Sequence, residues 1–168
     1  MTRDLLSNTE LHAPALVGLV ADLMLEQQLM LATAESCTGG MIAAACTDLA
    51  GSSAWFERGF VTYSNEAKTE LLGVAAGSIA EHGAVSEEVA RAMAEGALRH
   101  SHAQAAVAVT GVAGPGGGSA AKPVGTVWFA WSVKGRLSSE CRHFDGDRAQ
   151  VRAATLSHAL QRLLQLLK

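Results

Sequence analysis

Residues 31–46 read LATAESCTGGMIAAAC, and this stretch indicates how the chain folds. Its first four residues are apolar enough for a short buried strand, and its last six suit a helix. Ser36 then lies at a strand-to-helix turn, where backbone N–H groups are left free. The glycines after it let the backbone approach a ligand closely, and a helix N-terminus favours developing negative charge. Ser36 therefore has the surroundings that a nucleophile needs.

Helices and strands alternate outward from this stretch, and only one pair of strands forms a hairpin, through Lys134-Gly135-Arg136. This pattern predicts the α/β class: a single three-layer α/β/α domain over residues 1–168, with a mixed, largely parallel sheet. We expect strands over residues 31–34, 60–63, 105–110, 124–133 and 137–144, and helices over residues 12–30, from Thr38 or Gly39 to 49, over 64–72, and after the N-caps Ser86 and Asp147.

Composition excludes several functions. The formal net charge is −3 and no run of Lys or Arg occurs, which argues against a nucleic-acid partner. No stretch is apolar enough to cross a membrane, and Met1–Asp4 does not resemble a signal peptide. The three cysteines lack a CxxC spacing, which favours reduced thiols and a cytoplasmic enzyme. His100 and His102 would face different sides of a helix, so we expect no metal site and no cofactor.

Lys68 is the candidate base for Ser36. If Ser64 caps the helix over 64–72, Lys68 lies near its positive end, where the neutral amine is relatively favoured. A lysine with a lowered pKa can act as a general base, and serine–lysine pairs are an alternative to Ser-His-Asp. A solvated surface lysine is the simpler interpretation of the spacing alone. Tyr63 could bond to either residue, and Cys37 is a rival nucleophile because a helix N-terminus lowers a thiol pKa.

Further residues are candidates for binding a substrate. Thr110 ends a buried strand, and Gly111 begins a glycine-rich loop whose N–H groups could cradle a phosphate or an oxyanion. Arg148, at the start of the last helix, offers a guanidinium suited to phosphate, or it could pair with a neighbouring aspartate. Ser53, in a loop, could donate to a substrate or simply form a turn. No Walker or dinucleotide-binding motif is present.

Six blocks of this sequence together are similar to those of a known family. They are TAESCTGG, AGSSAWFERGFVTYSNEAK, HGAVSEEV, TGVAGPGGGS, KPVGTVWFAW and GDR, in this order and spread over about residues 33–155. The chain thus resembles the CinA C-terminal domain family, and within it the stand-alone nicotinamide-nucleotide amidases (PncC-type). Longer members of the family carry a further N-terminal domain, for which we expect no room in this chain.

The resemblance implies hydrolysis of nicotinamide mononucleotide to nicotinic acid mononucleotide and ammonia, in pyridine-nucleotide recycling in bacteria. It implies Ser36 as nucleophile, Lys68 as base and Tyr63 as a possible proton relay, with no metal or cofactor. Thr38, Gly39 and Gly40 would supply N–H groups to the oxyanion. Ser53, Thr110, Gly111 and Arg148 would bind the nucleotide.

Other readings stay open at this point. One is a non-catalytic nucleotide-binding module linked to competence or DNA damage response, although a pure binder needs no base. Another is an amidase for a different small amide. The resemblance and the apolar composition also lead us to expect a homo-oligomer, a dimer or larger.

Overall fold

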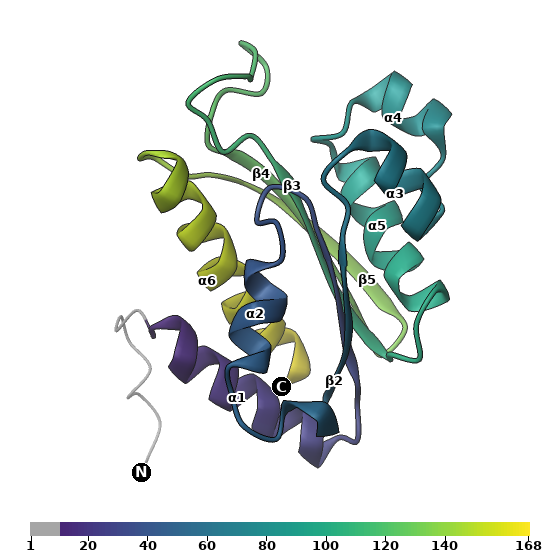
Figure 1. The fold of residues 1–168 in the computed structure, drawn as a ribbon, viewed down its shortest axis with the longest axis vertical. Coiled ribbons are helices and arrows are strands. Elements are labelled where there is room, and N and C mark those ends of the chain that lie inside the picture. The colour runs from purple at the N-terminus through teal and green to yellow at the C-terminus, as the bar shows by residue number, and fades with distance from the viewer. Residues whose placement is uncertain (1–10) are drawn as a thin grey trace.

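A computed structural model describes residues 11–168 of the chain. The prediction of a single domain over residues 1–168 and the prediction that Met1–Asp4 is no signal peptide therefore include residues outside the described range. Within that range the chain alternates helices and strands, as Figure 1 shows. The strands are β1 (Leu31–Glu35), β2 (Phe56–Val61), β3 (Ala105–Gly111), β4 (Thr126–Val133) and β5 (Arg136–His143). The helices are α1 (Ala13–Glu26), α2 (Met41–Thr47), α3 (Asn65–Leu72), α4 (Ala76–His82), α5 (Glu87–Arg99) and α6 (Arg148–Leu167), with a short 3₁₀ helix, η1 (Ser52–Ala54).

The strands form one mixed sheet in the order β2-β1-β3-β4-β5. The first three are parallel, and β4 and β5 continue the sheet in antiparallel fashion. The apolar run that was predicted to be a central strand, β3, indeed lies in the middle and is buried almost throughout. The carboxyl ends of β1, β2 and β3 therefore meet at one edge of the sheet, where α/β proteins commonly bind ligands.

Helices cover both faces of the sheet, which confirms the three-layer α/β/α architecture (Figure 1). On one face α1, α2 and α6 bury an apolar cluster that includes Trp131, Phe129 and Leu160. On the other face α3, α4 and α5 bury a cluster rich in alanine, with Met93 and Leu72. Small side chains on this second face let α5 lie close to the sheet.

Local signals placed several element ends correctly. Ser64, Ser86 and Asp147 are N-caps whose side chains accept from the third backbone N–H of α3, α5 and α6. Lys134 and Gly135 both have positive φ, as a two-residue hairpin loop between β4 and β5 requires.

Other boundaries differ from the prediction. The first helix ends at Glu26, and Gln28 has φ of 54°. The second helix begins only at Met41, because Gly39 and Gly40 have φ of 59° and 104° and so leave the right-handed helical region. Helix α4 was not predicted, since no side chain caps its N-terminus and it is only seven residues long.

Strand β2 begins at Phe56, four residues before the prediction. It is an edge strand, paired only with β1, so a polar run such as Glu57-Arg58 is tolerated there. The ladder also contains a bulge: Leu31 pairs with Phe56 but Ala32 pairs with Arg58, which leaves Glu57 as an extra residue. Beyond the bulge the register runs regularly to the pair Glu35–Val61.

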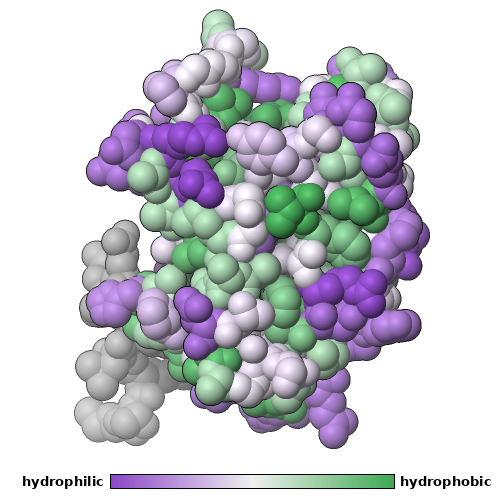
Figure 2. Space-filling model, viewed as in Figure 1, coloured by the Kyte–Doolittle hydropathy of each residue, from purple (hydrophilic) through white to green (hydrophobic). Residues whose placement is uncertain are grey.

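The surface on the side seen in Figure 1 is mixed, and Figure 2 shows apolar residues gathered near its middle, over β2 and α3. Val61 and Leu71 are exposed large apolar residues of these two elements. Within residues 11–168, no helix combines the length and the apolar character needed to cross a bilayer.

Candidate active site

The turn that carries Ser36 is built at the carboxyl end of β1. The Ser36 N–H donates to the carbonyl of Val109 in β3 at 3.1 Å, which continues the parallel ladder into the turn. Gly39 and Gly40 then reverse the chain with their positive φ values, and Gly40 is the N-cap of α2. Ser36 is 8% exposed, so its hydroxyl is accessible only through a narrow opening.

Glu35 holds this turn from inside the protein. Its carboxylate is fully buried and accepts from the Thr38 hydroxyl at 2.6 Å and from the N–H groups of Ile42 and Ala43 at 2.8 and 3.0 Å. A carboxylate at the start of a helix also suits the helix dipole. The side chain next to the candidate nucleophile thus ties the turn to α2.

Lys68 lies directly beside Ser36. Its Nζ donates to the Ser36 Oγ at 3.0 Å and to the Thr62 carbonyl at 2.9 Å, and the side chain is only 1% exposed. Burial disfavours the ammonium form and lowers the pKa of Lys68 below its ordinary value. The alternative interpretation, a solvated surface lysine, is therefore wrong. No carboxylate forms an ion pair with Lys68 in the described part of the chain.

Tyr63 and Arg148 contact each other across the opening of the site. The Arg148 Nη2 donates to the Tyr63 Oη at 3.0 Å, and its Nη1 donates to the Gly114 carbonyl at 2.9 Å. Tyr63 is 62% exposed and makes no hydrogen bond to Ser36 or Lys68. No contact in the structure therefore supports the suggested proton relay through its phenol. Among residues 11–168 no aspartate pairs with Arg148, which leaves its charge available to a ligand.

These residues surround one cavity of about 260 Å³ at the carboxyl edge of the parallel strands. The Thr110 hydroxyl donates to the Ala84 carbonyl at 2.9 Å, so its oxygen remains able to accept from a ligand. Gly111 is required for packing, because a Cβ there would lie 2.7 Å from Val127 and 2.9 Å from the Thr126 carbonyl. The cavity is lined by Ser36, Cys37, Tyr63, Asn65, Lys68, Ala84, Val85, Thr110, Gly111, Ala113 and Arg148.

The backbone donors of the turn differ from the prediction. The Gly39 N–H donates to the Ser36 carbonyl at 3.1 Å, and the Thr38 hydroxyl is occupied by Glu35. Among the described residues, the N–H groups of Cys37, Thr38 and Gly40 have no acceptor. Of these three residues Cys37 lines the cavity, so its N–H is the best placed to stabilise an oxyanion.

Ser53 does not reach this cavity. It lies in η1, directly before β2, and therefore at the amino ends of the parallel strands, whereas Ser36 follows the carboxyl end of β1. The structure therefore does not bring Ser53 together with Ser36, and a contact between Ser53 and the substrate stays a prediction. Its local composition indicated a loop, but not at which end of the sheet the loop would lie.

Cys37 is not set up as a nucleophile. It is almost fully buried, and burial raises the pKa of its thiol to about 11, so that the thiol stays protonated at neutral pH. The expected lowering by the start of α2 is outweighed by desolvation. Ser36 has a base within hydrogen-bonding distance and Cys37 has none.

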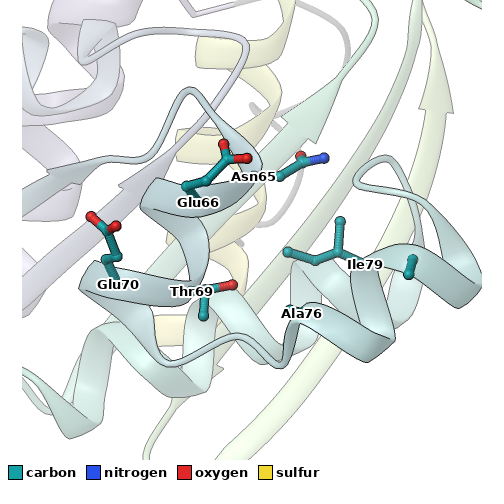
Figure 3. Close-up of a pocket in the computed structure, with 7 residues that line it drawn as sticks. Asn65, Glu66, Thr69, Glu70, Ala76 and Ile79 are labelled. Carbon is teal, nitrogen blue, oxygen red and sulfur yellow. The ribbon is translucent and has the colours of Figure 1, made fainter.

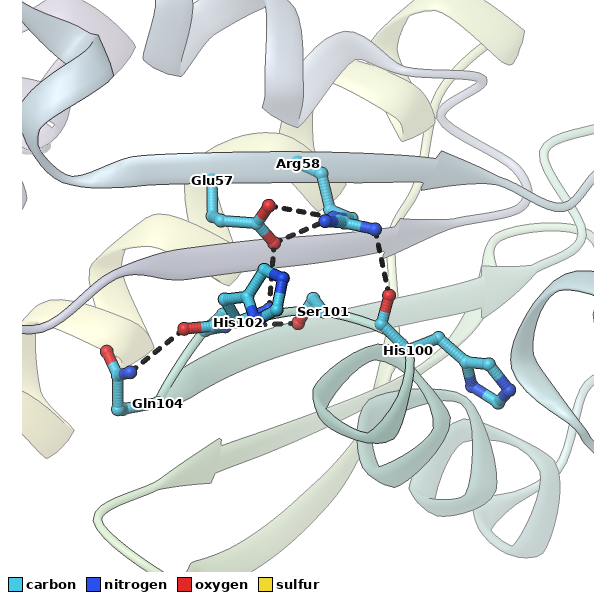
Figure 4. Close-up of polar contacts among 7 residues, drawn as sticks. Glu57, Arg58, His100, Ser101, His102 and Gln104 are labelled. Atoms are coloured by element: carbon cyan, nitrogen blue, oxygen red, sulfur yellow. Dashed lines mark hydrogen bonds and ion pairs between the residues drawn. The ribbon is translucent and has the colours of Figure 1, made fainter.

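The two histidines of the H-x-H pair have structural contacts (Figure 4). The His100 Nδ1 lies 2.9 Å from the Gly96 carbonyl, and the His102 N–H donates to the Glu57 carboxylate. Arg58 completes the cluster, bound to Glu57 and to the His100 carbonyl. Within residues 11–168 no group of three or more His, Cys, Asp or Glu side chains is arranged to hold a metal ion.

A second cavity of about 380 Å³ lies between α3 and α4 (Figure 3). It is lined by apolar side chains such as Ile79 together with Thr69, Glu66 and Glu70, and its lining includes no lysine, arginine or histidine that could serve as a base or bind an anion. Two carboxylates disfavour a phosphorylated ligand there. The cavity at Ser36 is therefore the candidate active site.

Sequence reasoning missed two residues that shape this site, Glu35 and Arg152. Arg152 of α6 donates to the carbonyls of Cys37 and Thr38, at 3.2 and 3.1 Å. Its spacing of four from Arg148 places both arginines on the same face of α6, which is the signal that could have revealed it. Glu35 could have been found as a carboxylate within an otherwise apolar strand.

The fold and the site together define a class of protein. A family model described as the CinA C-terminal domain matches residues 14–167, and the chain belongs to this family. It is 61% identical over 134 residues to the nicotinamide-nucleotide amidohydrolase PncC of Pseudomonas putida, covering 80% of this chain and 84% of that protein. With the protein of the same name from Escherichia coli K12 it shares 57% identity over 136 residues, or 79% of this chain and 81% of that one.

The same relationship is seen in a solved structure. The crystal structure of the competence damage-inducible protein A (ComA) from Klebsiella pneumoniae superimposes with a TM-score of 0.89. It is 41% identical to this chain, and the match covers 92% of this chain and 96% of that one. The three-layer fold with its mixed sheet is thus the fold of the family.

Proposed function

We propose that this protein is a nicotinamide-nucleotide amidohydrolase, which converts nicotinamide mononucleotide to nicotinic acid mononucleotide and ammonia with a serine–lysine dyad. The observation that carries the proposal is the 3.0 Å contact between the Lys68 Nζ and the Ser36 Oγ, both buried at the bottom of a cavity. The names of the relatives from Pseudomonas putida and Escherichia coli support the substrate.

The first half of the reaction acylates Ser36. Neutral Lys68 takes the proton of Ser36 as the Oγ attacks the carboxamide carbon of the substrate. The Cys37 N–H stabilises the oxyanion of the tetrahedral intermediate. Donors of this kind contribute about 10²–10³-fold each in comparable enzymes. The intermediate collapses, the carbon–nitrogen bond breaks, and Lys68 returns the proton to the departing ammonia.

The second half releases the acid. Water attacks the ester carbon, Lys68 accepts the proton of the water, and the ester bond to Ser36 breaks. The proton then returns from Lys68 to the Ser36 Oγ, and the dyad is ready for another cycle. Each step uses the same lysine because it is the base that contacts Ser36.

The opposite side of the cavity would bind the nucleotide. Arg148 lies at the first position of α6, where a guanidinium and the helix N-terminus both favour a phosphate. The Tyr63 phenol holds Arg148, and the Thr110 oxygen can accept from a hydroxyl or an amide. Because binding energy at the phosphate orients the distant amide, free nicotinamide should be a poor substrate.

Ammonia release from purified protein with nicotinamide mononucleotide tests the proposal, with Ser36→Ala measured beside the parent. We expect turnover by the parent and a loss of at least about 10³-fold in the variant, since a serine nucleophile has no substitute here. Binding of the nucleotide to Ser36→Ala, measured by calorimetry, should persist. A folded parent that binds the nucleotide without releasing ammonia would contradict the proposal and favour a binding module.

Cytoplasmic localisation and the role in pyridine-nucleotide recycling follow from this proposal, because the substrate is an intracellular metabolite class. A homo-oligomer remains our expectation from the family resemblance. Sedimentation analysis of the purified protein tests it, and a monomer at micromolar concentration would contradict it.

A further inference from the structure

Arg152 binds the turn that carries the nucleophile, and this is its only set of hydrogen bonds among the described residues. Its Nε donates to the Cys37 carbonyl at 3.2 Å and its Nη2 to the Thr38 carbonyl at 3.1 Å. Within residues 11–168 no carboxylate pairs with it. A half-buried arginine directed at two backbone carbonyls next to Ser36 suggests a role in the site rather than an ordinary surface ion pair.

The turn needs such support because its middle is conformationally free. Gly39 and Gly40 have no Cβ and can adopt several backbone conformations. Glu35 holds the turn on its inner side, through the Thr38 hydroxyl and the first N–H groups of α2. Arg152 holds the other side, from α6. The turn is therefore fixed between a buried carboxylate and a guanidinium.

Holding a carbonyl also orients the N–H of the same peptide group, because the peptide is planar and its C=O and N–H point in opposite directions. Arg152 holds the Thr38 carbonyl and thereby fixes the Gly39 N–H of the same peptide group. The Ser36 carbonyl, held by the Gly39 N–H, orients the Cys37 N–H in the same way. Catalysis by an oxyanion site depends on donors that are fixed before the reaction.

We propose that Arg152 is a positioning residue, which fixes the peptide groups after Ser36 so that the Cys37 N–H is aligned for the oxyanion. The inference rests on the proposed function. It also links two parts of the site: Arg148 lies one turn earlier on the same face of α6, in the cavity. A phosphate bound at Arg148 steadies the segment from which Arg152 holds the nucleophile turn.

The test compares Arg152→Met and Arg152→Lys with the control Arg162→Met. Arg162 is another arginine of α6, bound to Glu140 and Gln165 and remote from the cavity. For each protein we would measure kcat and KM for nicotinamide mononucleotide, the melting temperature, and the rate at which a serine-directed sulfonyl fluoride labels Ser36 without nucleotide.

We expect Arg152→Met to lower kcat by about 10²-fold with little change in KM, because a misplacement of about 1 Å in the reacting groups costs this much. Arg152→Lys should fall between parent and Arg152→Met, since one ammonium cannot reproduce the planar fork. The rate at which the sulfonyl fluoride labels Ser36 should decrease from the parent to Arg152→Lys and further to Arg152→Met. Arg162→Met should match the parent in kcat and labelling.

Several results would overturn the inference. A rise in KM at unchanged kcat would mean that Arg152 binds substrate, and parent-like values in both Arg152 variants would mean that it positions nothing. A parent that labels at Ser36 but does not release ammonia would refute the substrate, and the labelling rates would still decide the role of Arg152. A parent that neither labels nor turns over would refute the dyad, and the inference with it.

Discussion

At the scale of single residues, the environment of Lys68 decides the chemistry. The side chain is buried against a backbone carbonyl and a serine hydroxyl, and no carboxylate of the described residues forms an ion pair with it that would keep it charged. An amine so placed gives up its proton more readily than one in water, and it can then accept one from Ser36. Burying this amine also lowers the stability of the folded protein. The role of Lys68 as the base can therefore be tested in two independent ways, through the reaction rate and through the free energy of unfolding.

The first is the effect on the rate. Lys68→Met should lower kcat by about 10²–10⁴-fold, the usual contribution of a positioned general base. In the parent, kcat/KM should rise with pH as the free enzyme loses the Lys68 proton, with a midpoint below the ordinary lysine value of 10.5. Stopped assays of ammonia release across pH would check this. A rate that is flat with pH, or a Lys68→Met variant of parental activity, would exclude Lys68 as the base.

The second is the effect on stability. Because the pKa of Lys68 is lower in the folded than in the unfolded protein, the unfolded chain binds more protons between these two values. The stability contribution of Lys68 should therefore rise as pH rises through this window, towards 10.5. Urea unfolding would measure the free energy of unfolding of the parent and of Lys68→Met. As pH rises, the value for the parent should increase relative to that for the variant. A difference independent of pH would mean that burial does not perturb Lys68.

Cys37 gives a contrasting prediction. Its thiol is buried and has a pKa of about 11, whereas Cys141 is exposed. Brief treatment of the folded protein with iodoacetamide should label Cys141, leave Cys37 and the buried Cys46 unmodified, and leave the activity unchanged. Mass spectrometry of the peptides would locate the label. If activity were lost in parallel with modification of Cys37, the cysteine would again be a candidate nucleophile.

At the scale of elements, helix α6 brings Arg148 and Arg152 to the site, and its first turn is held by a capping box. The Asp147 side chain accepts from the Gln150 N–H, while the Gln150 side chain accepts from the Asp147 N–H. Asp147→Ala should lower the free energy of unfolding by about 1 kcal/mol, as loss of such a cap does. Asp145→Ala is the control, because Asp145 is exposed and caps no helix; its one ion pair among the described residues is with His143. If Asp147→Ala and Asp145→Ala changed the free energy of urea unfolding equally, the N-cap would contribute no specific stability.

Helix α5 approaches α3, which carries Lys68, through Gly96. A Cβ at Gly96 would lie 2.1 Å from the Leu72 carbonyl, so Gly96→Ala must push the two helices apart. Gly18 in α1 has nothing within 4 Å of an added Cβ. Gly18→Ala should therefore stabilise the protein by roughly 0.5–1 kcal/mol through helix propensity, while Gly96→Ala should destabilise it. The sign of the two changes, measured by thermal unfolding, is the test. A stabilising Gly96→Ala would contradict the close packing.

The elements also show what sequence can and cannot predict. Ser64, Ser86 and Asp147 were found as N-caps because capping depends on residues three positions away. The start of β2 and helix α4 escaped because an edge strand tolerates polar residues and α4 has no capping side chain. The family resemblance was the main reason to assign Ser36, Lys68 and Arg148 to one site. The position of Ser53 apart from Ser36 could not be predicted, because nothing in its neighbourhood indicates at which end of the sheet its loop lies.

At the scale of the whole molecule, the site depends on strands that are distant in sequence. Ser36 follows β1, Lys68 follows β2 by one helical turn, Thr110 ends β3, and Arg148 begins α6. Parallel pairing of β2, β1 and β3 brings the first three to one edge. Contacts between such distant parts of the chain cannot be derived from local patterns. The bonds from Arg152 to the nucleophile turn, which span 114 and 115 residues, therefore appear only in the folded chain.

The bulge at Glu57, at the far end of the β1–β2 ladder, has a consequence for how this chain tolerates changes in length. Downstream of it, each residue added or removed between Arg58 and Val61 would shift the strand along β1 by about 3.3 Å, more than the 3.0 Å that separates the Lys68 Nζ from the Ser36 Oγ. Upstream of it, the loop before η1 can absorb an extra residue without shifting the ladder. Insertions should therefore be accepted in the loop at residues 49–51 and rejected between Arg58 and Val61, so that one extra residue in a strand separates a permissive stretch of the chain from one whose length is dictated by the dyad.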